Sequence, residues 1–71
     1  MTLRARPIFR VHQYVSHVPW IEIAYWNADD GMPMDLFGLD LPEGTTFERA
    51  EEIAEFLSQN ITQFTYTKTT P

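Results

Sequence analysis

Hydrophobic and polar residues alternate with a period of two over residues 7–15 and again over residues 19–27. This period, carried by β-branched and aromatic residues, predicts two β-strands. Residues 16–18 would join the strands as a hairpin in which Val15 pairs with Pro19.

The same pattern predicts the register of the hairpin. A three-residue loop at this position places His12 opposite Glu22 and Tyr14 opposite Trp20. A shift of one residue would bring Val11 opposite Glu22 and mix the two faces, so we favour the first register.

Two further strands are expected after the hairpin. The Asp-Gly pair within residues 27–31 is a strong signal for a type I′ turn, in which both central residues have positive φ. Residues 33–40 follow as a third strand, which Gly38 weakens and which Pro33 confines to an edge or a strand start. Residues 61–68 alternate again and predict the last strand.

Residues 46–58 are expected to form the helix. Thr45 and Glu48 have the spacing of a capping box at its start, and Asn60 suits a left-handed residue after its end. The apolar residues recur at helical spacing and form one stripe, consisting of Phe47, Ala50, Ile53, Ala54 and Leu57. The solvent side carries Glu48, Glu51, Glu52 and Glu55.

The element order is therefore β-β-(β)-α-β, which predicts the α+β class: a small antiparallel sheet of three to four strands backed by one helix. We expect residues 1–71 to form a single domain, with residues 1–6 and 69–71 frayed. A chain of this length buries only about 60 % of the surface that its unfolded form exposes. It has no cysteine, so disulfides cannot add stability.

Both faces of the predicted hairpin are apolar, whereas one helix can cover only one face. The face assigned to the helix carries Phe9, Val11, Val15, Ile21, Ile23 and Tyr25. The other face carries Ile8, Tyr14, Trp20, Ala24 and Trp26 among Arg10, His12 and Glu22. Two readings stay open: residues 32–41 fold back over this second face, or a partner covers it.

We favour the partner, because tryptophan, tyrosine and arginine dominate the energetics of protein interfaces. An exposed apolar patch of this kind usually marks a binding surface. The expected protein-binding residues are Arg10, His12, Tyr14, Trp20, Glu22 and Trp26. The partner would be another protein or a second copy of the chain, most simply in a homodimer.

The net charge of −5 argues against direct binding to nucleic acid or to an anionic membrane, since both need a basic surface. No apolar run approaches the roughly 20 residues of a membrane span. The first seven residues lack the apolar stretch of a secretory signal. We therefore expect a cytoplasmic protein.

Residues that could carry chemistry are few. His12 opposite Glu22 could form an acid–base pair, but no serine, cysteine or further carboxylate is placed to complete a catalytic site. Two histidines without cysteine do not make a zinc site, and residues 29–31 do not fit the calcium-loop template. We expect no catalytic residue, no metal and no cofactor, so the chain is not expected to be an enzyme.

The glutamates of the helix suggest an alternative function. Glu48/Glu52 and Glu51/Glu55 are like-charge pairs four residues apart, which mildly destabilise a helix. Such a face could bind a basic partner, as acidic inhibitors and nucleic-acid mimics of the phage-encoded type do.

Residues 44–50 resemble the segment before the helix in HicB-like antitoxins, which share the order β-β-β-α-β. This resemblance implies an antitoxin-like role for the acidic alternative. Those antitoxins usually carry a DNA-binding extension that this sequence lacks, and we do not assign the chain to the family.

Overall fold

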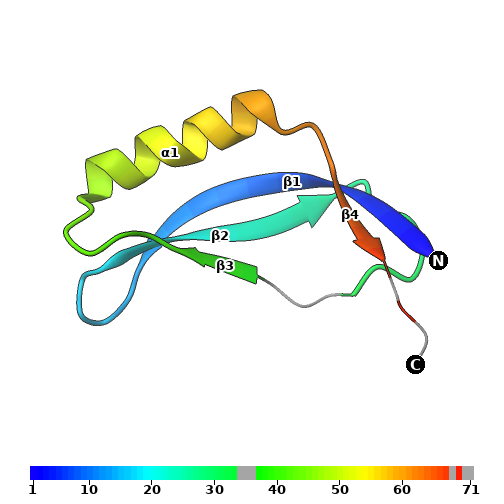
Figure 1. Cartoon of the computed structure of the whole chain (residues 1–71), viewed down its shortest axis with the longest axis horizontal. Coiled ribbons are helices and arrows are strands. Elements are labelled where there is room, and N and C mark those ends of the chain that lie inside the picture. The colour runs from blue at the N-terminus through cyan, green and yellow to red at the C-terminus, as the bar shows by residue number, and fades with distance from the viewer. Residues whose placement is uncertain (34–36, 68, 70–71) are drawn as a thin grey trace.

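The fold is a four-stranded antiparallel sheet that curls beneath a single helix (Figure 1). The computed structural model describes residues 1–33, 37–67 and 69. Along the chain the elements are β1 (Thr2–Gln13), β2 (Pro19–Trp26), β3 (Phe37–Asp40), α1 (Phe47–Asn60) and β4 (Phe64–Thr67). The strands lie in the order β3-β2-β1-β4, so the predicted α+β class and element order are confirmed.

The long central strand β1 connects two halves of the sheet. Its residues 2–5 pair with β4, and its residues 6–13 pair with β2. The expectation that residues 1–6 are frayed is therefore wrong for residues 2–6. Leu3 and Ala5 are buried, because the alternation of the first strand continues to the start of the chain.

The β1–β2 hairpin differs from the predicted register by two residues. His12 pairs with Trp20, whereas Tyr14 lies at the loop, where its amide donates to the carbonyl of Val18 over 2.9 Å. His17 has a φ of 67°, and its backbone amide closes the turn by donating to the carbonyl of Tyr14. A tight turn followed by a left-handed residue is a common three-residue hairpin loop. A shift of two residues leaves every side chain on its predicted face, so alternation does not exclude it.

The helix covers the face of the sheet that the sequence assigned to it, which we call the helix face. α1 contacts β1 and β2. The buried apolar residues include Leu3, Ala5, Ile21, Ala50 and Ala54. The two alanines allow a close approach of α1 to the sheet, where Ile21 is fully buried. Val15, expected on this face, is instead fully exposed in the hairpin loop.

The ends of the helix differ from the prediction. The N-cap is Thr46, whose Oγ1 accepts from the amide of Arg49 over 3.1 Å. Thr45 instead donates its hydroxyl to the carbonyl of Pro42, so no capping box with Glu48 forms. At the other end, Asn60 is the last helical residue, and the following residue is extended rather than left-handed.

The segment between β2 and β3 is longer than a tight hairpin. The amide of Met32 donates to the carbonyl of Asp29, and in this turn only Gly31 has positive φ, at 89°. Positive φ at the third residue alone matches a type II turn, so the predicted type I′ turn is wrong. β3 begins at Phe37 rather than at residue 33, and residues 34–36 of the predicted strand lie outside the described residues.

The N-cap can be tested directly. Thr46→Ala should lower the free energy of unfolding by about 1 kcal/mol, because the amide of Arg49 loses its acceptor. Urea denaturation followed by circular dichroism measures the change. Thr62→Ala, at an exposed position after the helix, is the control and should stay within about 0.5 kcal/mol of the original chain. Equal losses in both variants would contradict the assigned cap.

Candidate functional site

The face of the sheet opposite α1, which we call the open face, carries the residues predicted to bind a partner. The alternation of β1 and β2 brings Arg10, His12, Trp20, Glu22 and Trp26 to this side, and Tyr14 joins them from the hairpin loop. No helix or strand of residues 1–33, 37–67 and 69 lies over this face (Figure 1). β3 extends the edge of the sheet beside β2 instead of folding back across it.

Three rings gather at the hairpin end of the open face. The ring of Trp20 stacks on His12, with centroids 5.0 Å apart, and on Tyr14, with centroids 5.7 Å apart. On the β3 side, a Cβ atom at Gly38 would lie only 3.0 Å from the Trp20 ring. Gly38, which weakened the strand prediction, thus leaves room for the indole. Trp20 is half-buried by these contacts and supports the sheet.

A buried carboxylate lies at the centre of the open face. The side chain of Glu22 is only 11 % exposed, and its oxygens lie 3.8 Å from Nη1 of Arg10 and 3.4 Å from Nε2 of His12. Arg10 is the direct cross-strand partner of Glu22, and His12 contacts it diagonally. The predicted proximity of His12 and Glu22 is thus present in a different register. The carboxylate is shared with a guanidinium, an arrangement that stabilises a buried charge.

Trp26 is the most exposed aromatic residue of the open face. Its side chain lies at the end of β2, is 55 % exposed, and has the guanidinium of Arg6 at 5.6 Å from the ring centroid. Arg6 and Trp26 are cross-strand partners, and a cation over an indole ring is favourable. Arg6 was missing from the predicted site because residues 1–6 were expected to be frayed. Its alternation with Arg10 is the signal that could have identified it.

Asp40 is a second residue that sequence reasoning missed. The hydroxyl of Tyr14 donates to Oδ1 of Asp40 over 2.8 Å and thereby connects the hairpin loop to β3. This hydrogen bond raises the pKa of Tyr14, with smaller contributions from burial and from the negative charge of Asp40. The bond joins two elements that are distant in sequence, and no local sequence pattern predicts it.

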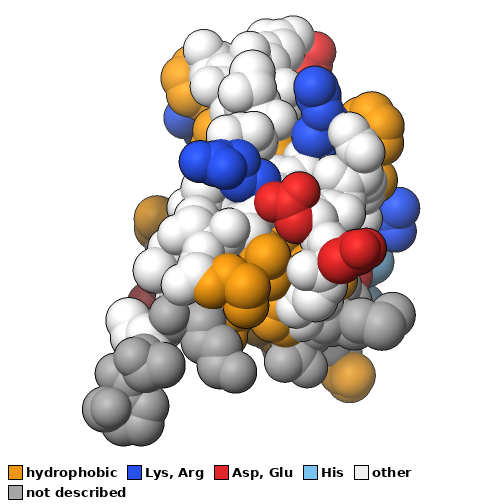
Figure 2. Space-filling model, turned by 90° about the vertical axis from the view of Figure 1, so that its right-hand side faces the viewer, with side chains coloured by type: hydrophobic (Ala, Val, Ile, Leu, Met, Phe, Trp, Pro, Cys, Tyr) orange, Lys and Arg blue, Asp and Glu red, His pale blue; other side chains and the backbone are white. Residues whose placement is uncertain are grey.

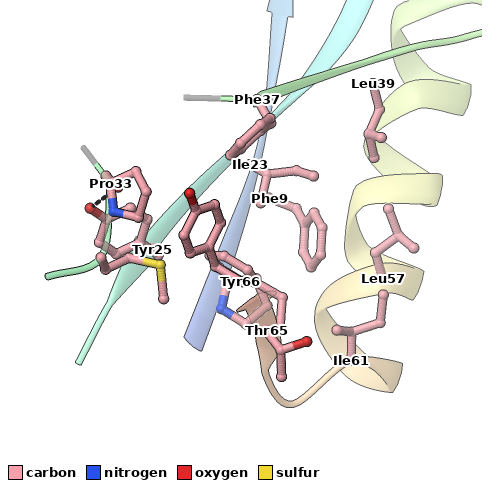
Figure 3. A pocket seen from close by; sticks show the side chains of 13 residues that line it. Phe9, Ile23, Tyr25, Pro33, Phe37, Leu39, Leu57, Ile61, Thr65 and Tyr66 are labelled. Atoms are coloured by element: carbon pink, nitrogen blue, oxygen red, sulfur yellow. Dashed lines mark hydrogen bonds between the residues drawn. The ribbon is translucent and has the colours of Figure 1, made fainter. Parts of the chain in front are cut away.

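The helix α1 covers only part of the helix face. Beside α1 lies an apolar pocket of about 350 Å³, lined by side chains from all four strands and from the end of the helix (Figure 3). Its walls include Phe9, Ile23, Tyr25, Phe37, Leu39 and Leu57. Phe37 is 55 % exposed there, so the expectation that one helix would complete this core holds only over β1 and part of β2.

The predicted acidic surface lies on the outer side of α1. Glu48, Glu51, Glu52 and Glu55 are all exposed. Glu52 pairs with Arg49 over 3.6 Å. Phe56, four residues after Glu52, is 63 % exposed on the same helix and did not belong to the predicted stripe. The outer side of α1 therefore combines negative charge with one large apolar ring.

Charges of both signs meet at the end of the molecule that carries the N-terminus. There Asp29 accepts from the amide of Arg4 over 2.9 Å through its carboxylate. Acidic and basic side chains lie around an exposed hydrophobic patch in the view of Figure 2. This end therefore presents charges of both signs, whereas the outer side of α1 carries four glutamates and Arg49.

The histidine and carboxylate side chains of the described residues form no group of three that could hold a metal ion. The helix α1 is too short and too polar to cross a bilayer.

A scan against protein-family models matched none to this chain, and searches of curated proteins and of solved structures likewise found no match.

The contact between Tyr14 and Asp40 predicts a change in titration. Asp40→Asn should lower the pKa of Tyr14 towards its ordinary value, because a neutral amide replaces the charged acceptor of the phenol proton. In the original chain this contact stabilises the fold fully at pH values below the ordinary tyrosine pKa. The stabilisation is lost as the pH rises through the raised pKa of Tyr14. Phenolate absorbance, compared with Tyr14→Phe to isolate the group, measures the shift.

Asp30→Asn is the matched control, since Asp30 is exposed in the 27–31 loop. It should leave the tyrosine titration unchanged. A titration of Asp40→Asn that superimposes on that of the original chain would contradict the contact.

Proposed function

We propose that this chain is a non-catalytic protein-interaction module that associates with a second copy of itself through the open face. The observation that supports this most strongly is Trp26, which is 55 % exposed beside Arg6. Tryptophan and arginine are among the residues that contribute most to binding at protein interfaces.

The composition of the open face fits a protein partner. Ile8, Ala24 and the aromatic rings supply apolar area around the Arg10–Glu22 pair, and Arg6 lies exposed beside Trp26. Apolar area interspersed with a few charged and polar groups is common at protein interfaces. A sheet generally packs a second layer on each apolar face, and a second copy of the chain would supply the missing layer.

Trp26 is a better test residue than Trp20. The ring of Trp20 packs against Gly38 and two neighbouring rings, so its removal would weaken the sheet itself. Trp26 makes fewer such contacts and can be truncated with less effect on folding. Phe37 is an equally exposed aromatic residue on the opposite face of the sheet, which makes it a matched control.

The test is light scattering across a concentration series. The average mass of the original chain should rise with concentration. Trp26→Ala should require at least about tenfold more protein for the same rise, which corresponds to about 1.4 kcal/mol of binding free energy. Phe37→Ala should follow the original chain. Circular dichroism should confirm that both variants fold. A chain that stays monomeric throughout, or a Trp26→Ala variant that associates unchanged, would overturn the proposal.

A second candidate function is an acidic inhibitor or nucleic-acid mimic that binds a basic partner through α1. The exposure of Glu48, Glu51, Glu52 and Glu55 favours it. Binding of this kind should weaken steeply with salt, because exposed charges are screened. It would survive Trp26→Ala, which separates it from association through the open face.

A further inference from the structure

The apolar pocket of the helix face lies where α1 leaves the sheet uncovered (Figure 3). The helix packs against β1 and β2 and does not contact β3. Leu57 from the end of α1 and Leu39 from β3 therefore line a hollow instead of a closed core. Its volume of about 350 Å³ lies within the range that is usual for small-molecule sites.

The wall of this pocket is held in place by contacts within the chain. The rings of Tyr25 and Phe64 meet edge to face with centroids 6.0 Å apart, which joins β2 to β4. The hydroxyl of Tyr25 donates to the carbonyl of Pro33 over 2.5 Å and ties the segment after the 29–32 turn to the sheet. A wall that is ordered before binding lowers the cost of holding a ligand.

The side chains of the wall determine the charge of a suitable ligand. None of the described residues that line the pocket is charged, and only Thr65 and the two tyrosines carry a polar side-chain group. The hydroxyl of Tyr25 already donates to Pro33. A charged ligand would lose its hydration in this pocket without gaining an ionic partner, so an uncharged ligand fits best.

Aromatic rings form a large part of the wall, and they favour an aromatic ligand. Rings prefer to meet other rings edge to face or in offset stacks. The ring-bearing residues of the wall are Phe9, Tyr25, Phe37, Phe64 and Tyr66. An apolar cavity of about 150 Å³ holds one benzene molecule, so a pocket of about 350 Å³ has room for two fused rings.

We propose that the pocket beside α1 is a binding site for a small, uncharged aromatic molecule with the size of two fused rings. The site lies on the helix face and uses none of the residues of the open face. It is therefore a second binding surface, which goes beyond association of the chain with another copy.

Naphthalene is the probe for this site, and nuclear magnetic resonance of the isotope-labelled chain measures its binding. The amide signals of residues that line the pocket should shift and saturate as naphthalene is added, whereas those of Arg6 and Trp26 stay unchanged. Naphthalene-2-sulfonate has the same rings and a negative charge. It should bind at least about tenfold more weakly, because its charge finds no partner in the wall.

A variant that fills the pocket tests its location. Leu39 is 36 % exposed at the wall, so Leu39→Trp can place a larger side chain there. This variant should bind naphthalene at least about tenfold more weakly, a change of about 1.4 kcal/mol. Val15→Trp is the matched control, since Val15 is fully exposed in the hairpin loop, and it should bind like the original chain. Circular dichroism checks that both variants fold.

Phe37→Ala provides a second variant if Leu39→Trp fails to fold. Phe37 is 55 % exposed, and its removal takes one ring from the wall, so naphthalene should bind at least about threefold more weakly. Association and naphthalene binding are then measured on the same two chains. Phe37→Ala should lose naphthalene affinity and keep association, whereas Trp26→Ala should lose association and keep naphthalene affinity.

Four results would overturn the inference. They are the absence of saturable shifts at the pocket, equal binding of naphthalene and its sulfonate, unchanged binding by a folded Leu39→Trp, and loss of association in Phe37→Ala. The last result would show that a second copy occupies the pocket. A chain that binds naphthalene but stays monomeric would overturn the proposed function alone and leave this site standing.

Discussion

One helix can cover one face of a sheet, and this constraint shapes the whole molecule. α1 packs over β1 and β2 with two alanines at the contact, and the core around Ile21 forms there. On the opposite side of the sheet, Trp20 stacks on neighbouring rings and Trp26 lies beneath the guanidinium of Arg6. Residues 1–33, 37–67 and 69 form no second layer over this side. The open face follows directly from having a single helix.

Side chains of the chain itself already contact part of the open face, and these contacts determine which residues of the face stay accessible. Trp20 packs beside Gly38, and Glu22 lies 3.8 Å from the guanidinium of Arg10. Trp26 and Arg6 lie beyond these contacts and are the accessible pair. The apolar pocket beside α1 shows that the helix face is also only partly covered, because the helix does not contact β3.

Sequence periodicity predicted the class, the element order and the face of nearly every strand residue, because alternation reports which side of a sheet is buried. It could not predict the register, since a shift of two residues keeps the faces and the choice depends on the left-handed His17. Arg6 and Asp40 were missed for different reasons. Arg6 lay in a segment expected to fray, and Asp40 reaches Tyr14 only through the pairing of distant strands.

We propose that another copy of the chain covers the open face. Acrylamide quenching tests it most directly, using Trp20→Phe so that Trp26 is the only tryptophan that emits. Trp26 should be readily quenched in dilute solution, where its exposed ring meets solvent, and should be protected from quencher as the protein concentration rises. Quenching that stays equally strong at every concentration would contradict coverage of the open face by a second copy.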